Sequence, residues 1–144
     1  MGKASQGRKV QDNQAICIVK NIRVSPRKLN LVTQPIRGQK VQTALNTLSF
    51  LNKRVALDVK KALQSAIANA ENNHRLDVDR LIVREAIVGV SLSMRRFHVR
   101  GRGKIAPVER PFANLRIVVE EVKETAPAKA KPAKKAKSAK GEQA

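Results

Sequence analysis

Residues 94–116 carry seven Lys or Arg side chains and one acid, and this stretch constrains the fold more than any other. Alternating apolar sequence lies on both sides of it, which is typical of strands. Its middle, with Arg-Gly-Arg-Gly-Lys at 100–104, offers few apolar side chains for a core. Ordinary protein surfaces mix charges of both signs. We therefore predict two long strands joined by a basic tip that projects from a small body toward a polyanion.

The charge of the whole chain points to the same class of partner. The formal net charge is +19 over 144 residues, with a pI near 11.2. Such a charge opposes compaction unless a polyanion neutralises it, so nucleic acid is the first candidate and an acidic membrane surface the second. Three Phe, no Tyr and no Trp leave little for base stacking. Phosphate contacts and shape are therefore the expected mode of binding.

Composition divides the chain into three parts. We predict that residues 1–13 form a flexible basic arm, residues 14–123 a single globular domain, and residues 124–144 a disordered tail rich in Lys, Ala and Pro. The single cysteine, Cys17, excludes a disulfide within the chain and fits a reducing compartment. The chain has no apolar run of the roughly 20 residues that span a bilayer, and its first residues lack the apolar core of a secretory signal. We expect a cytoplasmic protein that does not bind membranes.

The first half of the domain predicts one strand and three helices. The strand covers 15–23. A helix then begins at Ser25 and Pro26, with Ser25 as its N-cap and Gly38 as its C-cap, and Pro35 either ends it near Thr33 or kinks it. Apolar residues at helical spacing predict a second helix over 41–51 and a longer third helix over 53–73.

The second half predicts the other two strands. A long strand covers 80–96, with a bulge or bend at Gly89, and its partner covers 115–122. We place one set of apolar residues on a single face of the long strand: Ile82, Ala86, Val88, Val90, Leu92 and Met94. The predicted fold class is α+β, with three helices packed on a small three-stranded antiparallel sheet and a long protruding basic β-hairpin.

No arrangement of residues indicates catalysis. His74 and His98 lie in a polar turn and in the basic stretch, and neither has a nucleophile in a recognisable motif. Asp77 and Asp79 precede a strand, where Asp commonly serves turn geometry, and they lack further metal ligands nearby. We expect no enzymatic activity, no metal, no cofactor and no small-molecule substrate.

Several segments resemble the bacterial L22 family of large-subunit ribosomal proteins. The resemblance runs from about residue 14 to 121, in the family's order and spacing. It rests on V-S-P-R-K-L at 24–29, I-R-G-Q-K-V at 36–41, S-A-I-A-N-A-E-N-N at 65–73, L-D-V-D-R-L at 76–81, M-R-R at 94–96, R-G-R-G-K at 100–104 and L-R-I-V-V-E at 115–120.

This resemblance implies a structural constituent of the large subunit that binds its ribosomal RNA. It also implies a hairpin that lines the nascent-peptide exit tunnel, contacts with neighbouring ribosomal proteins and with the nascent polypeptide, and a part in subunit assembly. Two positions and one segment depart from the family pattern: Pro35 replaces an aliphatic residue, Gly101 replaces an Ala, and 105–108 is less basic.

Charge, hydrogen-bonding capacity and the resemblance together give the candidate site residues. Those predicted to bind ribosomal RNA are Arg23, Ser25, Arg27, Lys28, Arg37, Lys40, Lys53, Lys60, Lys61, Asn69, Asn72, Asn73, Arg95, Arg96 and Arg110. Those predicted at the tunnel tip are Arg100, Gly101, Arg102, Gly103 and Lys104. Asn72 and Asn73 could instead cap the third helix.

Two other functions stay open from the residues alone. A histone-like architectural DNA-binding protein also uses basic β-arms with a proline, and Pro107 and the tail at 124–144 fit that class. A nucleic-acid-processing enzyme is the third alternative, and it would need Asp77 and Asp79 as a functional carboxylate pair.

Overall fold

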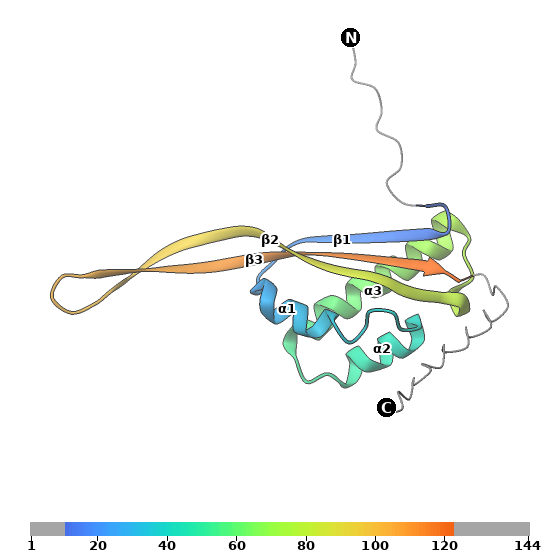
Figure 1. Ribbon diagram of the computed structural model, residues 1–144, viewed down its shortest axis with the longest axis horizontal. Coiled ribbons are helices and arrows are strands. Elements are labelled where there is room, and N and C mark those ends of the chain that lie inside the picture. The colour runs from blue at the N-terminus through green and yellow to red at the C-terminus, as the bar shows by residue number, and fades with distance from the viewer. Residues whose placement is uncertain (1–10, 123–144) are drawn as a thin grey trace, which may run out of the picture.

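A computed structural model describes residues 11–122 of the chain, and its framework is a three-stranded sheet (Figure 1). The strands are β1 (Gln14–Ile22), β2 (Leu81–Val99) and β3 (Ile105–Glu121). Their order is β1-β3-β2, and both neighbouring pairs are antiparallel. The predicted antiparallel sheet is therefore confirmed. Residues 1–10 of the predicted arm and 123–144, which hold the predicted tail, lie outside the described residues.

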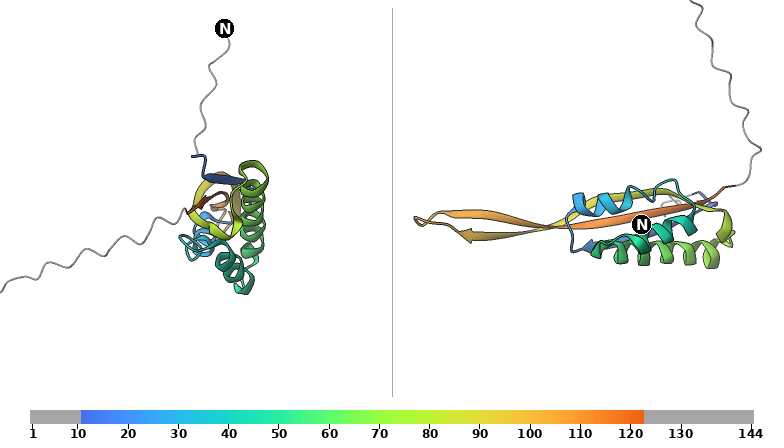
Figure 2. Two further views of the ribbon diagram at one scale, coloured as in Figure 1. Left: turned by 90° about the vertical axis from the view of Figure 1, so that its right-hand side faces the viewer. Right: turned by 90° about the horizontal axis from the view of Figure 1, so that it is seen from below.

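Three helices lie alongside the part of the sheet that contains β1, while the two longer strands continue past them (Figures 1 and 2). These helices are α1 (Pro26–Thr33), α2 (Val41–Phe50) and α3 (Arg54–His74). A short 3-10 turn, η1 (Val78–Arg80), leads into β2. The fold class is α+β, as the sequence predicted.

The core forms between β3 and the long helix α3. Alternate residues of β3, among them Leu115 and Ile117, turn to the helices and are fully buried. Val59 and Leu63 on the apolar stripe of α3 are also fully buried. Because side chains alternate along a strand, every second residue of β3 can reach this core. The body is thus held mainly by apolar burial at about 25 cal/mol per Å².

The first helix differs from its predicted capping. It ends at Thr33, before Pro35, which is one of the two predicted outcomes. Ser25 has the extended backbone of an N-cap, but its side chain makes no capping hydrogen bond among the described residues. Gly38 is not the C-cap, because that position falls on Gln34. Gly38 instead has φ +74° in the following turn and donates its N–H to the Val83 oxygen at 2.7 Å.

Of the predicted bulge or bend at Gly89, the bulge is wrong. Gly89 pairs regularly with Asn114, and the irregular pairings of β2 lie between Val83 and Glu85 and between Val90 and Ser93. An extra residue in one strand changes which side chains face the core. The buried residues of β2 are therefore Leu81, Val83 and Ala86, while Ile82, Val88, Val90, Leu92 and Met94 are half-buried or exposed.

The C-terminal end of α3 also corrects a prediction. Asn72 and Asn73 do not cap the helix, because both lie inside its last turn together with His74. Arg75 is the C-cap, with a left-handed backbone at φ 53°, and its N–H donates to Glu71 and Ala70 oxygens. The helix therefore ends on a non-glycine left-handed residue, a conformation that Arg adopts less readily than Gly or Asn.

Beyond the body, β2 and β3 form a projecting hairpin, defined here as residues 93–111. Its pairings run from Ser93–Pro111 to Val99–Ile105. The strands are longer than the predicted limits of 96 and 115, and only residues 100–104 form the connecting loop. Figures 1 and 2 show this ribbon extending away from all three helices. The predicted protruding β-hairpin is confirmed.

Candidate nucleic-acid interface

Three arginines from three separate parts of the chain meet where the projecting hairpin leaves the body. Arg23 follows β1, Arg96 lies on β2 and Arg110 lies on β3. They line one hollow of about 280 Å³ together with three apolar residues, Met94, Pro111 and Phe112. No acid lines this hollow, which we call the root pocket. None of the guanidinium groups of its arginines forms a hydrogen bond or an ion pair within residues 11–122.

The register of the hairpin gives it two chemically different faces. Directly opposed residues of antiparallel strands share a face. One face holds the pairs Met94–Arg110 and Arg96–Val108, so its charges are uncompensated cations. The opposite face holds the pairs Arg95–Glu109, Phe97–Pro107 and Val99–Ile105.

On that second face, the charge of Arg95 is partly offset. Its Nε atom lies 3.8 Å from Oε1 of Glu109. Both side chains are largely exposed, so solvent weakens this attraction. Ser93 Oγ on this face donates to Oε2 of Glu109 at 3.4 Å, the side chains nearer the tip are apolar, and Phe97 is 73% exposed. Arg95 is therefore a weaker candidate for phosphate contact than Arg96 or Arg110.

All five predicted tip residues lie together in the loop that joins β2 to β3. The N–H of Lys104 donates to the Gly101 oxygen at 3.3 Å, and the N–H of Arg100 donates to the Lys104 oxygen at 2.8 Å. Arg102 and Gly103, at the centre of the turn, have φ of 58° and 68°. Positive φ at both central residues is the pattern of turns that match the twist of a hairpin. The turn leaves Arg100, Arg102 and Lys104 exposed at the far end of the molecule.

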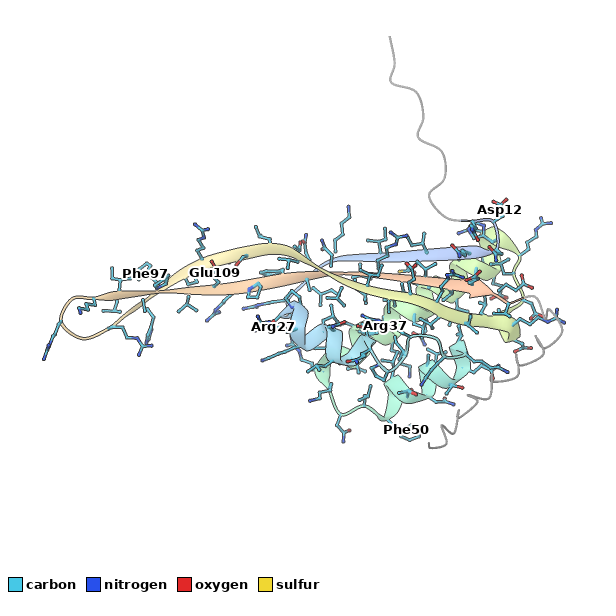
Figure 3. All side chains as sticks on the ribbon, in the orientation of Figure 1. Asp12, Arg27, Arg37, Phe50, Phe97 and Glu109 are labelled. Atoms are coloured by element: carbon cyan, nitrogen blue, oxygen red, sulfur yellow. The ribbon has the colours of Figure 1, made fainter. Side chains whose placement is uncertain are left out.

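A second group of predicted residues surrounds α1. Arg27, Asn30, Arg37, Arg84 and Glu85 contribute to a hollow of about 520 Å³ between α1 and β2. Figure 3 shows Arg27 and Arg37 on this side of the body. Arg27 and its neighbour Lys28 are exposed and have no ion-pair partner within residues 11–122.

Arg37 is already bonded within the protein. Its Nε donates to the Ala86 oxygen at 2.9 Å, and its Nη2 donates to Oδ1 of Asn30 at 2.6 Å. These bonds connect the turn after α1 to β2 and to α1 itself. Arg37 therefore has a structural role whether or not it also contacts RNA.

Arg84 is likewise engaged. It donates a hydrogen bond to Glu120 and pairs with it electrostatically, and these two effects raise the pKa of Arg84. The guanidinium therefore stays charged at any physiological pH.

The predicted residues on the remaining helices are scattered over the surface. Lys60 donates from Nζ to Oγ of Ser49 at 3.0 Å, and Lys61 lines a hollow between β1 and α3 that also contains Arg23 and Asp58. Asn69 is half-buried, and its Nδ2 donates to the Ile16 oxygen at 3.2 Å, which joins α3 to β1. The others are exposed: Lys40, Lys53, Asn72 and Asn73.

Asp77 and Asp79 serve the local turn, as their position predicted. Oδ1 of Asp77 accepts from the Asp79 N–H at 3.1 Å, and Oδ2 of Asp77 pairs with Arg80 Nε at 3.3 Å. Asp79 accepts from Gln42 Nε2 at 3.0 Å. Within residues 11–122 no group of three or more His, Cys, Asp and Glu side chains could hold a metal ion. In the same part of the chain, no helix is long and apolar enough to cross a membrane.

Sequence reasoning missed the apolar half of the root pocket, namely Met94, Pro111 and Phe112. These residues look like ordinary strand residues when only hydrophobicity is considered. A usable signal was present, however, because Phe112 is two residues from Arg110 and therefore shares its face of the strand. None of the three Phe belongs to the buried core.

The chain matches known proteins over nearly all of its described part. The family model described as Ribosomal protein L22p/L17e matches residues 17–120. The chain is 60% identical over 124 residues to the large ribosomal subunit protein uL22 of Brucella suis biovar 1 (strain 1330), which covers 86% of this chain and 96% of the relative. It is 62% identical over 122 residues to the protein of the same name from Rhizobium meliloti (strain 1021), covering 85% and 95%. The corresponding protein of Agrobacterium fabrum (strain C58 / ATCC 33970) is 59% identical over 124 residues, covering 86% and 96%.

Proposed function

The chain belongs to the ribosomal protein L22p/L17e family, and we propose that it is a structural, non-catalytic constituent of the large ribosomal subunit that binds large-subunit ribosomal RNA. We further propose that the hairpin tip lines the nascent-peptide exit tunnel and that the protein aids subunit assembly. Its place is then the cytoplasmic ribosome, with neighbouring large-subunit proteins as further partners.

One observation carries the RNA-binding proposal. Cations whose side chains have no partner within residues 11–122 follow the hairpin from its root at Arg23, Arg96 and Arg110 to its tip at Arg100 and Arg102. Arg binds phosphate through two parallel hydrogen bonds, and each neutralised phosphate releases condensed counterions. The exposed glycine-containing turn adds a backbone that can approach phosphate closely.

Shape supports the tunnel role of the tip. A long two-stranded ribbon is at best marginally stable in water by itself. The projecting hairpin has side chains such as Val99 and Ile105 that are each 65% exposed, so its partner must cover it from outside. A ribbon that inserts between RNA segments would gain this cover and would present its tip on the far side.

Sedimentation tests the assignment to the subunit. A tagged full-length protein should co-sediment with large subunits at high Mg²⁺ and form crosslinks to large-subunit RNA. Its depletion should lead to the accumulation of incomplete large subunits. Recovery of the protein only in free or nucleoid fractions would contradict the proposal.

A photocrosslinker tests the tunnel role. Placed at Lys104 in the tip, it should capture a stalled nascent polypeptide, whereas the same group at Asp58 on the body should not. Equal capture at both positions would overturn the assignment of the tip to the tunnel.

The histone-like DNA-binding alternative is not favoured, because the relatives that cover most of this chain are named as large ribosomal subunit proteins. DNA adducts in place of ribosomal RNA adducts in the crosslinking experiment would revive it.

A further inference from the structure

We propose that the root pocket binds a single unpaired nucleotide, with its phosphate on the arginines and its base against Phe112. This inference rests on the proposed RNA binding and names the element of RNA that this part of the interface takes. The site combines residues from two strands and from the segment after a third: Arg23 follows β1, Met94 and Arg96 lie on β2, and Arg110 to Phe112 lie on β3.

The charge of the pocket selects an anion. Three guanidinium groups line it, and no carboxylate does. Glu109, the acid nearest in sequence, belongs to the opposite face of the hairpin, where it lies beside Arg95. Each guanidinium carries five N–H donors in a planar fork, and in this pocket none of them is used by a residue within 11–122. A phosphate group supplies both the charge and the acceptors.

The walls of the pocket select a flat apolar ring beside that phosphate. Phe112 and Pro111 are half-buried, so the body holds them in place while part of each surface stays accessible. Aromatic faces stack on bases of any sequence, and Arg planes do the same. The volume of about 280 Å³ is just below the usual range for drug-sized ligands, so it suits one ring system with its phosphate.

The hollow shape favours an unpaired nucleotide over a duplex. In an A-form helix the bases are stacked and paired, and proteins contact mainly phosphates and 2′-hydroxyls on a convex surface. A base can enter a concave pocket only when it is splayed out, as in loops and bulges.

Two other hollows of the body lack this combination. The hollow at α1 contains Glu85, and its Arg37 is bonded to Ala86 and Asn30. The hollow between β1 and α3 contains Asp58. An acid inside a pocket repels phosphate, so these two hollows are poor nucleotide sites.

Binding of two RNA probes to the full-length protein tests the inference. One probe is an RNA hairpin with a single bulged 2-aminopurine nucleotide, and the other is the same hairpin fully paired. We expect tighter binding of the bulged probe and quenching of the 2-aminopurine fluorescence on binding. Phe112→Leu should reduce the preference for the bulge about tenfold, as expected for loss of one base-stacking contact. The control Phe97→Leu, on the opposite face of the hairpin, should leave the preference unchanged.

The arginines are tested through salt. Arg110→Gln should reduce the magnitude of the slope of log K against log salt by about one for both probes. Arg80→Gln, which removes an exposed arginine paired with Asp77, should not change it.

Three outcomes separate the pocket from the general proposal. If the wild type binds both probes equally, or if Phe112→Leu keeps the full preference, the pocket inference is wrong while RNA binding stands. If neither probe binds and the protein is absent from large subunits, the proposed function itself fails. Should Phe112→Leu not fold, ultraviolet crosslinking of wild-type large subunits decides instead. RNA adducts are expected on the tryptic peptide 105–116, which contains Phe112, and their absence there would overturn the inference.

Discussion

The same two strands behave differently in the body and in the projecting hairpin. In the body, β3 alternates between core and surface, and Leu115 and Ile117 are fully buried beneath the helices. In the hairpin, β2 and β3 keep their backbone pairing from Ser93–Pro111 to Val99–Ile105, but their apolar side chains are largely exposed. Backbone pairing alone therefore does not make a stable unit, since three strands or a covering helix are usually needed.

Individual arginines of the two regions also differ in whether their guanidinium groups have protein acceptors. In the body, Arg37 and Arg84 have protein acceptors, at Ala86 and Asn30 for Arg37 and at Glu120 for Arg84. In the hairpin, Arg96 and Arg110 have none within residues 11–122. An arginine that already has acceptors stabilises the fold, whereas one without acceptors is available to a partner. We rank the following tests of this contrast by the expected loss of stability of the free protein.

The largest loss is expected in the core. Leu63→Ala removes a fully buried side chain of α3 and should lower the free energy of unfolding by about 2–5 kcal/mol, because it leaves a cavity. Val99→Ala, in the hairpin at 65% exposure, should change it by less than about 0.5 kcal/mol. Urea denaturation followed by circular dichroism measures both. Similar losses for the two variants would show that the hairpin folds as part of the core.

A smaller loss is expected at Arg37. Arg37→Ala removes the side-chain donor to the Ala86 oxygen and leaves Oδ1 of Asn30 with only the weak bond from Thr33 Oγ1 at 3.5 Å, which should cost about 1–3 kcal/mol. Arg96→Ala, which breaks no intramolecular bond within residues 11–122, is the matched control and should leave the unfolding midpoint almost unchanged. If Arg96→Ala proved as destabilising as Arg37→Ala, Arg96 would also stabilise the fold, and the distinction between structural arginines and arginines available to a partner would be wrong.

A loss of about 1 kcal/mol is expected for Gly38→Ala, since an alanine at φ +74° adopts the left-handed region at a cost. No atom lies within 4 Å of the added Cβ, so conformation alone decides the result. Gly89→Ala is the control: its Cβ also meets open space, its φ is not in the left-handed region, and it should be neutral or slightly stabilising. Equal destabilisation by Gly38→Ala and Gly89→Ala would indicate that the added methyl group, and not backbone strain, causes the loss.

The sequence predicted the elements well because their periodicities are strong. Helical spacing located α2 and α3 to within a few residues, and Pro35 marked the end of α1 near Thr33. The face of β2 was predicted incorrectly because the bulge between Val83 and Glu85 is set by pairing with β3, which no local pattern records. The C-cap at Arg75 was not predicted either, because Arg is not a typical residue for the left-handed conformation that ends α3.

The candidate site was predicted as single residues but not as a constellation. Positive charge was sufficient to select Arg23, Arg96 and Arg110. These arginines and Phe112 line one pocket only because of the register of β2 against β3 and the position where β1 ends. The bonds of Arg37 to Ala86 and Asn30 were also invisible, because they join segments far apart in the chain. Tertiary pairing, and not composition, therefore distinguishes the available cations from the engaged ones.

The smallest loss of stability is expected at the tip, where the change in RNA binding should nonetheless be clear. Arg100→Ala combined with Arg102→Ala removes two exposed cations that have no partner within residues 11–122. The melting temperature of the free protein should stay unchanged, because loop tips open locally without unfolding the core. Each lost phosphate contact should reduce the magnitude of the salt slope of RNA binding by about one, and incorporation into large subunits should fall. A large drop in melting temperature would mean that the tip stabilises the body, and the contrast between the two regions would then have to be abandoned.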